Sequence, residues 1–592
     1  GKPKLKKSVM GVLSYPFDWG TFIFVDKLLP VTLKYYEKTL DFALGEPRKT
    51  GEKISKRTWF GFFAFFAMFV VEGILSKFVP ITVGIILTAL LGIGVIMIFK
   101  NIRLRFMFGA FITLFFISQL YGVLGYGVEF FPDVEPRRVY IKFEAPTGTG
   151  IKETNEIIDK IEKKILTANF KDIEKILAVA GASSNPFDAG SSTPNKGSIT
   201  VEYLDYEKRE KSSKESTEEL RQLVEGTPGA AITIDKENMG PPVGLPVNIE
   251  VSGEDYNTLG KLTEEIRAYI KNTPGLVDVD DDYDAGKPEL RVIIDRKRAA
   301  LYGMNTSLIA NTVRTAINGA EASKYRVNED EYDITVRLRK DQRSSVDALK
   351  NLVIIFNNQN GKTLSVPLSS VANVFIDRGP GAIRRKDLNR VITITGNAAE
   401  GFNANAVLDS VKAKLVNYQL PQGHSISFTG QSQEQEDASN FLGKAFGIAI
   451  LLIFLILVIQ FNSVSQPFII MSAVIISLVG VFIGLLAFKM PFGIVMTGIG
   501  VISLAGVVVN NNIVLIDYMN LLKQRDMSLK EIAKYAGIRR FRPVTLTAVT
   551  TILGLIPLSF GFGFDIYTGS FVFGGESAEF WRSMGIAVIF GL

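Results

Sequence analysis

The 592-residue sequence has no cysteine and a single histidine, His424. The chain therefore forms neither disulfides nor thiolate metal sites, and one histidine leaves little scope for His-based catalysis or His-rich metal binding. We expect neither an enzyme nor a bound metal or cofactor. The formal net charge is only +6, which argues against a dedicated nucleic-acid-binding protein.

Apolar residues, in contrast, are abundant and concentrated in long runs. They make up 47% of the chain, and a polar stretch over 129–440 separates them into two groups. A helix needs about 20 apolar residues to cross a bilayer. The segments that meet this requirement are 59–78, 79–99, 106–128, 441–461, 468–488, 492–518 and 543–562. Another apolar segment begins near Met584 and stops with the sequence at Leu592, so it is too short to cross the bilayer. This predicts that the polypeptide is longer or that this sequence is a fragment.

Basic residues predict the orientation of these spans. Lys and Arg are frequent before the first span, between the second and third, and between the sixth and seventh. The positive-inside rule makes these loops cytoplasmic, so the polar stretch lies on the opposite side, which is the periplasm in a Gram-negative cell. Residues 29–44 are amphipathic and too charged to span. They predict either an interfacial helix on the cytoplasmic face or an ordinary soluble helix.

The polar stretch has a repeated pattern of strands and helices. Residues 139–235 follow the order β-α-β-β-α-β of the ferredoxin-like motif. The pattern restarts at 247–253, is interrupted by an α+β block between Pro288 and about Arg378, and resumes at 390–397. The predicted fold class is a multi-pass α-helical membrane protein with a large α+β extramembrane domain built of ferredoxin-like β-α-β units.

Two segments of this domain, one loop and one acidic run, need an interpretation. The loop 183–197 is long and contains Phe187; it is either a functional loop or a surface loop with one incidentally buried Phe. The acidic run 278–284 lacks the spacing of an EF-hand, and alternate residues of a strand face opposite sides. We therefore expect a solvated strand end there and no calcium site.

Three consecutive asparagines interrupt the apolar segment 492–518. Unpaired amides are costly in hydrocarbon, so they need partners in the bundle or water. Asn510 and Asp517 share a helix face that Ser503 extends, and Thr547 and Thr551 lie one turn apart on the next span, after Arg540. These polar residues form either an ion relay or hydrogen bonds that join helices. Since Asn does not titrate, a relay needs a carboxylate from elsewhere, and Glu72 in the first span is the competitor present in this chain.

Several segments resemble one membrane-transporter superfamily. The sequence GVVVNNNIVLIDY followed by RRFRPVTLTAVTTILGLIPL resembles the tenth and eleventh transmembrane helices of resistance–nodulation–division (RND) exporters, and VEFFPDVEPRRVYIKFEAPTGTG resembles their exit from the seventh helix into the porter domain. GPPVGLPVNIEVSG and VIQFNSVSQPFIIM are further matches. The resemblance covers roughly 105–592, in the family's order, and corresponds to the second half of such a pump.

The resemblance implies a domain organisation. It comprises a cytoplasmic segment with the interfacial helix (1–58), transmembrane helices with an extra hairpin at 59–99 (59–128), a first porter subdomain (129–245), a second porter subdomain in two parts (246–287 and 381–440), an inserted docking subdomain (288–380) and a transmembrane bundle with an incomplete last helix (441–592).

The resemblance also implies site residues. The loop 183–197 falls at the family's switch loop, with Asn185, Phe187 and Asp188 on the substrate path. Asn510, Asn511, Thr547 and Arg540 fall at positions that surround a pair of aspartates of the first half, and we assign them, together with Asp517, to an ion relay. Many multidrug members have Lys at the position of Asn510, and its absence leaves the coupling ion open.

The implied function is proton-driven export of amphiphilic or hydrophobic compounds through the inner membrane. The implied partners are two further copies in a homotrimer, a periplasmic adaptor, an outer-membrane channel, the first half with its acidic pair, the amphiphilic substrate and membrane lipid, but no nucleic acid. The alternatives are a membrane-anchored binding or scaffold protein without transport, and a lipid or heavy-metal exporter of the same superfamily. Isolated Met239 and Met304 and the lack of Cys favour the amphiphile exporter over the metal exporter.

Overall fold

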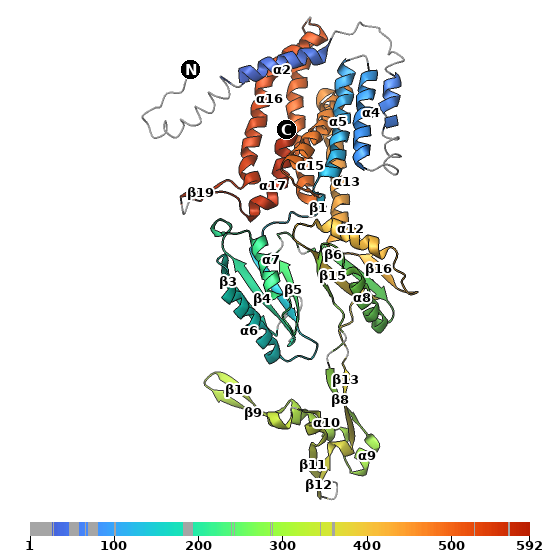
Figure 1. Cartoon of the computed structure of the whole chain (residues 1–592), viewed down its shortest axis with the longest axis vertical. Helices are drawn as coiled ribbons and strands as arrows, with labels where there is room; N and C mark the ends of the chain where they lie inside the picture. Colours follow the sequence, from blue (N-terminus) through green and yellow to red (C-terminus); the bar gives the residue numbers. More distant parts are fainter. Residues whose placement is uncertain are drawn as a thin grey trace.

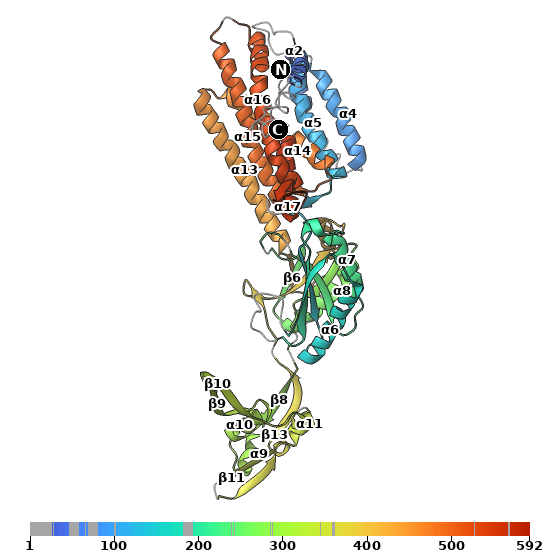
Figure 2. The ribbon, with the colours of Figure 1, turned by 90° about the vertical axis from the view of Figure 1, so that its left-hand side faces the viewer.

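The computed structural model describes residues 27, 29–45, 59–65, 67–68, 81–99, 102–181, 193–237, 239–241, 243–284, 286, 288–343, 345–357, 361–379, 381–525, 527–565 and 569–592. These residues form three layers along the long axis of the molecule: a helical bundle, two α/β units side by side, and a smaller α/β subdomain farthest from the bundle (Figures 1 and 2).

Within the described residues, five helices are long and apolar enough to cross a membrane. They are α5 (Ile102–Leu124), α13 (Gln431–Phe461), α14 (Ser465–Ala487), α15 (Ile494–Leu522) and α16 (Leu529–Phe560). The predicted span 79–99 corresponds to the shorter α4 (Ile81–Ile98). The predicted span 59–78 lies partly outside the described residues. Its described part, residues 59–65 and 67–68, is helical.

Three helices begin earlier than their apolar residues predict. The helix α13 starts at Gln431 instead of 441, and α16 and α17 also start early. The helix α16 starts at Leu529 instead of 543 because Ser528 and Glu531 form a capping box, in which the Ser528 Oγ accepts from the Glu531 backbone N–H at 3.3 Å. The last helix, α17 (Glu576–Gly591), starts well before Met584. Its first turn has two acidic residues, which the positive end of a helix dipole stabilises. Polar residues thus extend α16 and α17 beyond their hydrophobic segments, through a capping box in α16 and through acidic side chains in the first turn of α17.

The helix α17 lies in the middle of the bundle and packs against α14, α15 and α16. Glycines allow this close approach: a Cβ at Gly480 would lie 1.9 Å from the Phe590 carbonyl oxygen. Leu485, Leu504 and Ala587 are fully buried between these helices. Small residues at helix interfaces act in the same way in other membrane bundles.

The predicted amphipathic segment forms α2 (Leu29–Leu44). It lies across the end of the bundle remote from the α/β units (Figure 1) and contacts α5 and α16. Lys534 of α16 forms ion pairs with Glu37 at 3.1 Å and Asp41 at 2.8 Å. The helix therefore runs along the surface of the bundle instead of crossing with it.

The first α/β unit follows α5 through the short strand β1 (Val128–Glu129). Its elements are β2 (Arg138–Glu144), α6 (Ile151–Ala168), β3 (Ile173–Ala180), β4 (Lys196–Tyr203), η3 (Tyr206–Lys208), α7 (Ser213–Val224) and β5 (Ala231–Lys236). The strands form an antiparallel sheet in the order β3-β4-β2-β5. Ile161, Ile199 and Leu220 are fully buried between the sheet and its two helices.

The second unit has the same connectivity. It consists of β6 (Val247–Gly253), α8 (Tyr256–Ile270), β7 (Leu276–Asp281), β15 (Asn389–Ala398), α12 (Ala404–Leu415) and β16 (Ser425–Phe428). The strand β6 pairs with β15 and β16, and β15 also pairs with β7 and with the short β14 (Arg385–Lys386). After β16 the chain enters the bundle through α13.

The third subdomain is inserted between β7 and β15. Its first and last strands, β8 (Pro288–Ile294) and β13 (Ala372–Arg378), pair with each other and connect it to the second unit. Between them lie α9 (Arg296–Leu301), α10 (Thr306–Ile317), the hairpin β9–β10 (Ala320–Val327 and Asp330–Val336), η4 (Lys340–Gln342), α11 (Val346–Lys350), the hairpin β11–β12 (Val353–Asn357 and Thr363–Pro367) and η5 (Leu368–Ser370). It has a core of its own, with fully buried Ile309, Ile354 and Leu368.

The acidic run 278–284 differs from the solvated strand end that its sequence predicts. The Asp278 side chain is only 8% exposed and lies 2.6 Å from the Arg221 Nη1 of the first unit. Burial raises the pKa of Asp278, and the hydrogen bond from Arg221 opposes this rise. Asp281 and Asp282 pair with Arg267 and Arg384. These carboxylates are therefore structural, and one of them joins the two units.

Candidate functional site

The structure brings together two of the predicted relay residues. The Thr547 Oγ1 of α16 donates a hydrogen bond to the Asn511 Oδ1 of α15 at 3.0 Å. The next amide, Asn512, donates to the Ile470 carbonyl oxygen of α14 at 3.3 Å. Consecutive asparagines thus connect α15 to neighbours on two sides, because successive residues of a helix are about 100° apart.

The other predicted relay residues lie elsewhere on these helices. Asn510 and Asp517 are exposed, as is Ser503, so the predicted polar face of α15 lies on the surface of this chain. Arg540 does not join the amides: its guanidinium lies 4.5 Å from the centre of the Tyr518 ring. Within the described residues its Nε is buried without a hydrogen-bond partner.

A further amide pair joins the same helices at the end remote from the α/β units. Gln466 of α14 and Asn520 of α15 exchange two hydrogen bonds, of 3.1 and 2.9 Å. Sequence reasoning missed this pair. The signal was available, because the antiparallel arrangement of consecutive spans places the start of one beside the end of the next.

The predicted substrate-path residues Asn185, Phe187 and Asp188 lie outside the described residues, which end at 181 and resume at 193. The C-terminal end of their loop is anchored. Asn195 is 5% exposed and donates a hydrogen bond to the Ala145 carbonyl oxygen at 3.1 Å.

A cavity of about 230 Å³ lies between the two α/β units, close to the bundle. Its walls come from β5, the connection between β15 and α12, and the segment after β1. Polar contacts join the two units here: Lys236 Nζ lies 2.6 Å from Glu400 Oε2, and Asn397 Nδ2 donates to Asp235 Oδ1 at 3.2 Å. Since water replaces such contacts at little net cost, the units can separate here more easily than across an apolar interface.

Glu129 lines this cavity and is mostly buried. Burial raises its pKa to about 8; the nearby Asp133 raises it further, and Lys214 opposes the rise. The other carboxylates that line the cavity in the described part of the chain are ion-paired, including Asp133 with Lys214 at 2.7 Å. Phe130, Phe131 and Phe402 also line the cavity. The cavity therefore combines aromatic walls with one carboxyl group that forms no ion pair within the described part of the chain.

The backbone of Glu129 also connects the cavity to the bundle. The strand β1 pairs in parallel with β17 (Phe492–Gly493), and Glu129 is the register partner of Gly493, the N-cap of α15. A residue that lines the cavity is thus paired through its backbone with the start of the helix that contains the asparagines.

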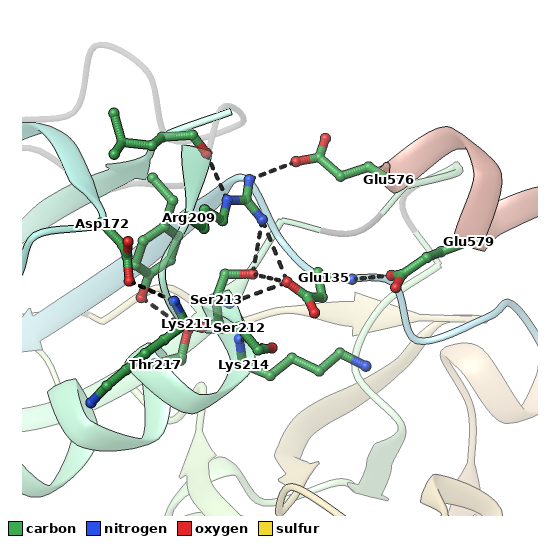
Figure 3. Close-up of polar contacts among 12 residues, drawn as sticks. Glu135, Asp172, Arg209, Lys211, Ser212, Ser213, Lys214, Thr217, Glu576 and Glu579 are labelled. Carbon is green, nitrogen blue, oxygen red and sulfur yellow. Dashed lines mark hydrogen bonds and ion pairs between the residues drawn. The ribbon is translucent and has the colours of Figure 1, made fainter. Parts of the chain in front are cut away.

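An ionic junction around one buried guanidinium ties the first unit to α17 (Figure 3). The side chain of Arg209, which follows η3, is 2% exposed, and its Nη2 lies 2.9 Å from Glu576 Oε1 in the first turn of α17. Its Nη1 lies 3.6 Å from Glu135 Oε2. The carboxylate of Glu579, one turn further along α17, accepts a hydrogen bond from the Glu135 backbone N–H at 2.9 Å.

The local chain positions Arg209 for these contacts. Its Nε donates to the Leu204 carbonyl oxygen at 2.6 Å. Asp172, 6% exposed, accepts hydrogen bonds from the backbone N–H groups of Glu210 and Lys211 at 2.7 and 3.1 Å. We call the contacts among Arg209, Glu135, Glu576 and Glu579 the Arg209 junction. Because its cation and two of its carboxylates lie far apart in the sequence, sequence reasoning did not find it.

Comparison with known proteins agrees with this architecture. The model of the AcrB/AcrD/AcrF family matches residues 96–592. The chain is 26% identical over 445 residues to the cobalt-zinc-cadmium resistance protein CzcA of Cupriavidus metallidurans, covering 74% of this chain and 42% of CzcA. It is 22% identical over 468 residues to the multidrug resistance protein MdtC of Proteus mirabilis, covering 78% of this chain and 43% of MdtC.

A crystal structure of a heavy metal efflux pump has the same fold, with a TM-score of 0.68, 21% sequence identity, and coverage of 82% of this chain and 48% of that chain. The chain spans less than half the length of the relatives described here. The resemblance seen in the sequence is confirmed, because the family match covers most of the chain and includes the bundle, both α/β units and the inserted subdomain. The chain belongs to the AcrB/AcrD/AcrF family of RND permeases.

Proposed function

We propose that this chain is the C-terminal half of an RND-type secondary active transporter that exports amphiphilic or hydrophobic compounds across the cell envelope, driven by the proton gradient. The observation that carries the proposal is the cavity between the two α/β units. Its aromatic walls suit an apolar body, and the carboxyl group of Glu129 suits a polar or cationic head.

The two α/β units would act as porter subdomains of ferredoxin-like topology that open and close the cavity as rigid bodies. The inserted subdomain would dock to a periplasmic adaptor and an outer-membrane channel, within a homotrimer in the inner membrane. No covalent step is needed, because transport requires only that the site alternate in access and affinity.

Protonation in the bundle would be coupled to movement of the first unit, starting from Asn511 of α15 and Thr547 of α16. Both helices pack on α17, and the Arg209 junction ties the first turn of α17 to that unit. Asn511 and Thr547 would hydrogen-bond acidic groups of the first half, together with Asn510 on the exposed face of α15. A change of charge there would displace α15 and α16, and α17 would transmit the displacement.

The test is a transport assay in cells that express the full polypeptide with Asn511→Ala or Thr547→Ala. We expect cells with either variant to accumulate an amphiphilic fluorescent dye, because each variant lacks the donor or the acceptor of the hydrogen bond between α15 and α16. The matched control is Thr550→Ala, whose hydroxyl bonds only to backbone carbonyl oxygens of its own helix. Unchanged efflux in both test variants would refute the relay role.

Export of divalent metal ions is the second candidate, because relatives such as CzcA are named for resistance to cobalt, zinc and cadmium. Within the described residues no group of three or more His, Cys, Asp and Glu side chains is arranged to hold a metal ion, which favours the amphiphile. Measuring growth inhibition by these three ions and by cationic amphiphiles, with and without the transporter, discriminates between the two candidates.

A further inference from the structure

The connection between α16 and α17 forms a small hairpin with an unusual aromatic surface. Its strands β18 (Gly563–Asp565) and β19 (Ser570–Val572) are antiparallel, with Phe564 opposite Phe571. Since side chains alternate along a strand, Phe562 and Phe564 of one strand face the same side as Phe571 and Phe573 of the other. We call these four side chains the phenyl face.

Ring contacts support this arrangement. The centroid of Phe571 lies 5.2 Å from that of Phe564 and 5.4 Å from that of Phe562, which in turn lies 5.3 Å from that of Phe573. The four rings therefore form one continuous cluster on one side of the hairpin.

The phenyl face is open to the surroundings. Phe562, Phe564, Phe571 and Phe573 are 41, 55, 63 and 66% exposed, respectively. Their ring contacts within the described part of the chain are with one another. An isolated two-stranded hairpin is at best marginally stable in water, and a contiguous exposed apolar patch marks an interaction surface. We therefore expect the phenyl face to be in contact with another apolar surface.

Close contacts at the base of the hairpin fix its position along the long axis of the molecule. The Gly574 N–H donates to the Gly561 carbonyl oxygen at 3.1 Å. Gly561 has a φ of +66°, and a Cβ there would lie 2.5 Å from the Gly574 carbonyl oxygen. A Cβ at Gly574 would lie 2.5 Å from Tyr206 Cε1 of the first unit. The base is thus closed tightly, between the end of the bundle and the first unit.

This position is level with the ends of the spanning helices. The hairpin follows the last turn of α16 and precedes the first turn of α17, and it projects sideways from the bundle at its junction with the α/β units (Figure 1). Phe560 and Phe488 lie at the same ends of α16 and α14, 41 and 39% exposed, with their centroids 5.7 Å apart. The phenyl face thus follows directly in the chain on the exposed apolar end of α16.

We propose that the phenyl face is a membrane-contact surface that inserts into the bilayer leaflet on the side of the α/β units, with phospholipid acyl chains as its partner. Continuity with the spanning helices is the reason to choose lipid over another protein: a hairpin that projects sideways at this height meets the edge of the bilayer. Aromatic side chains are favourable in this interfacial region. The contact holds the start of α17, and with it Glu576 of the Arg209 junction, at a constant depth.

The absence of native cysteine makes a direct test possible. The variants Phe571→Cys and Phe573→Cys, labelled singly with a nitroxide in the full chain, are reconstituted into phosphatidylcholine/phosphatidylglycerol vesicles. Power saturation then compares collisions with oxygen, which is enriched in the acyl region, and with nickel ethylenediaminediacetate, which stays in water. Leu388→Cys, 93% exposed in the second unit, is the water control, and Ile456→Cys, 64% exposed on α13, is the lipid control.

We expect labels at 571 and 573 to favour oxygen over the nickel complex, as the label at 456 does. Ratios equal to that at 388 would overturn the proposal. Exclusion of both reagents would also overturn it in favour of contact with protein, and dipolar broadening of the spectra would identify that protein as a second copy of the chain. Two positions on one face keep the test valid if either variant folds poorly. Failure here leaves the proposed export untouched, because the relay variants test export separately.

Discussion

Replacing Glu129 with Gln tests whether the carboxyl group in the cavity is held neutral. A pKa of about 8 instead of 4.5 corresponds to about 5 kcal/mol, at about 1.4 kcal/mol for each pH unit. Because the carboxyl group borders a cavity of about 230 Å³ that water can enter, we expect a smaller cost of burying its charge, about 2 kcal/mol.

The direction of the pH effect follows from proton linkage. Below pH 4.5 the folded and unfolded chains both hold this proton. Between 4.5 and about 8 the folded chain keeps the proton that the unfolded chain has released, so the contribution of Glu129 to stability falls as the pH rises through this window. Gln has no proton to lose, so in the Glu129→Gln variant position 129 does not contribute to the loss of stability as the pH rises.

The assay is the thermal unfolding midpoint of the full chain in detergent, measured from about pH 5 to about pH 9. We expect Glu129→Gln to unfold at a higher temperature than the unmodified chain at pH 8, and the two midpoints to converge near pH 5. Glu264→Gln, on the exposed side of α8, is the matched control and should follow the unmodified chain. If Glu129→Gln also follows it at every pH, Glu129 titrates as an ordinary carboxyl group and the reasoning fails.

Three further substitutions test contacts of the site. Arg209→Met leaves the partly buried carboxylates of Glu135 and Glu576 without their cation and should destabilise the chain by about 1.5–3 kcal/mol, whereas Lys171→Met, which breaks an exposed ion pair, should cost at most about 1 kcal/mol; equal midpoints of chemical unfolding would contradict this. Thr547→Val removes the hydrogen bond to Asn511 and should cost about 0.6–2 kcal/mol, and a drop in dye efflux without loss of folded protein would separate coupling from stability. Asp278→Asn should weaken the contact between the two α/β units, and spin labels on α7 and α12 should then give a broader distance distribution, while an unchanged distribution would rule out a role for this ion pair.

Local periodicity accounts for much of the fold. The apolar runs of α14 and α15 predict these helices to within a few residues, since hydrophobic length is a property of the segment itself. The polar starts of α13, α16 and α17 were missed, because a polar first turn extends a helix without extending its apolar run. The acidic strand end was misread for a related reason: periodicity says which way Asp278 points, but not that Arg221 of another unit lies there.

The sequence by itself determined the long apolar helices, the restart of the strand–helix pattern and the asparagines in α15, because each depends on residues that are close in the chain. Only the tertiary structure decided that Arg209 meets Glu576, 367 residues away, that Glu129 is buried beside an aromatic cavity, and that four phenylalanines share an uncovered face. Those properties depend on which distant surfaces exclude water from each side chain, and desolvation is set by the whole fold.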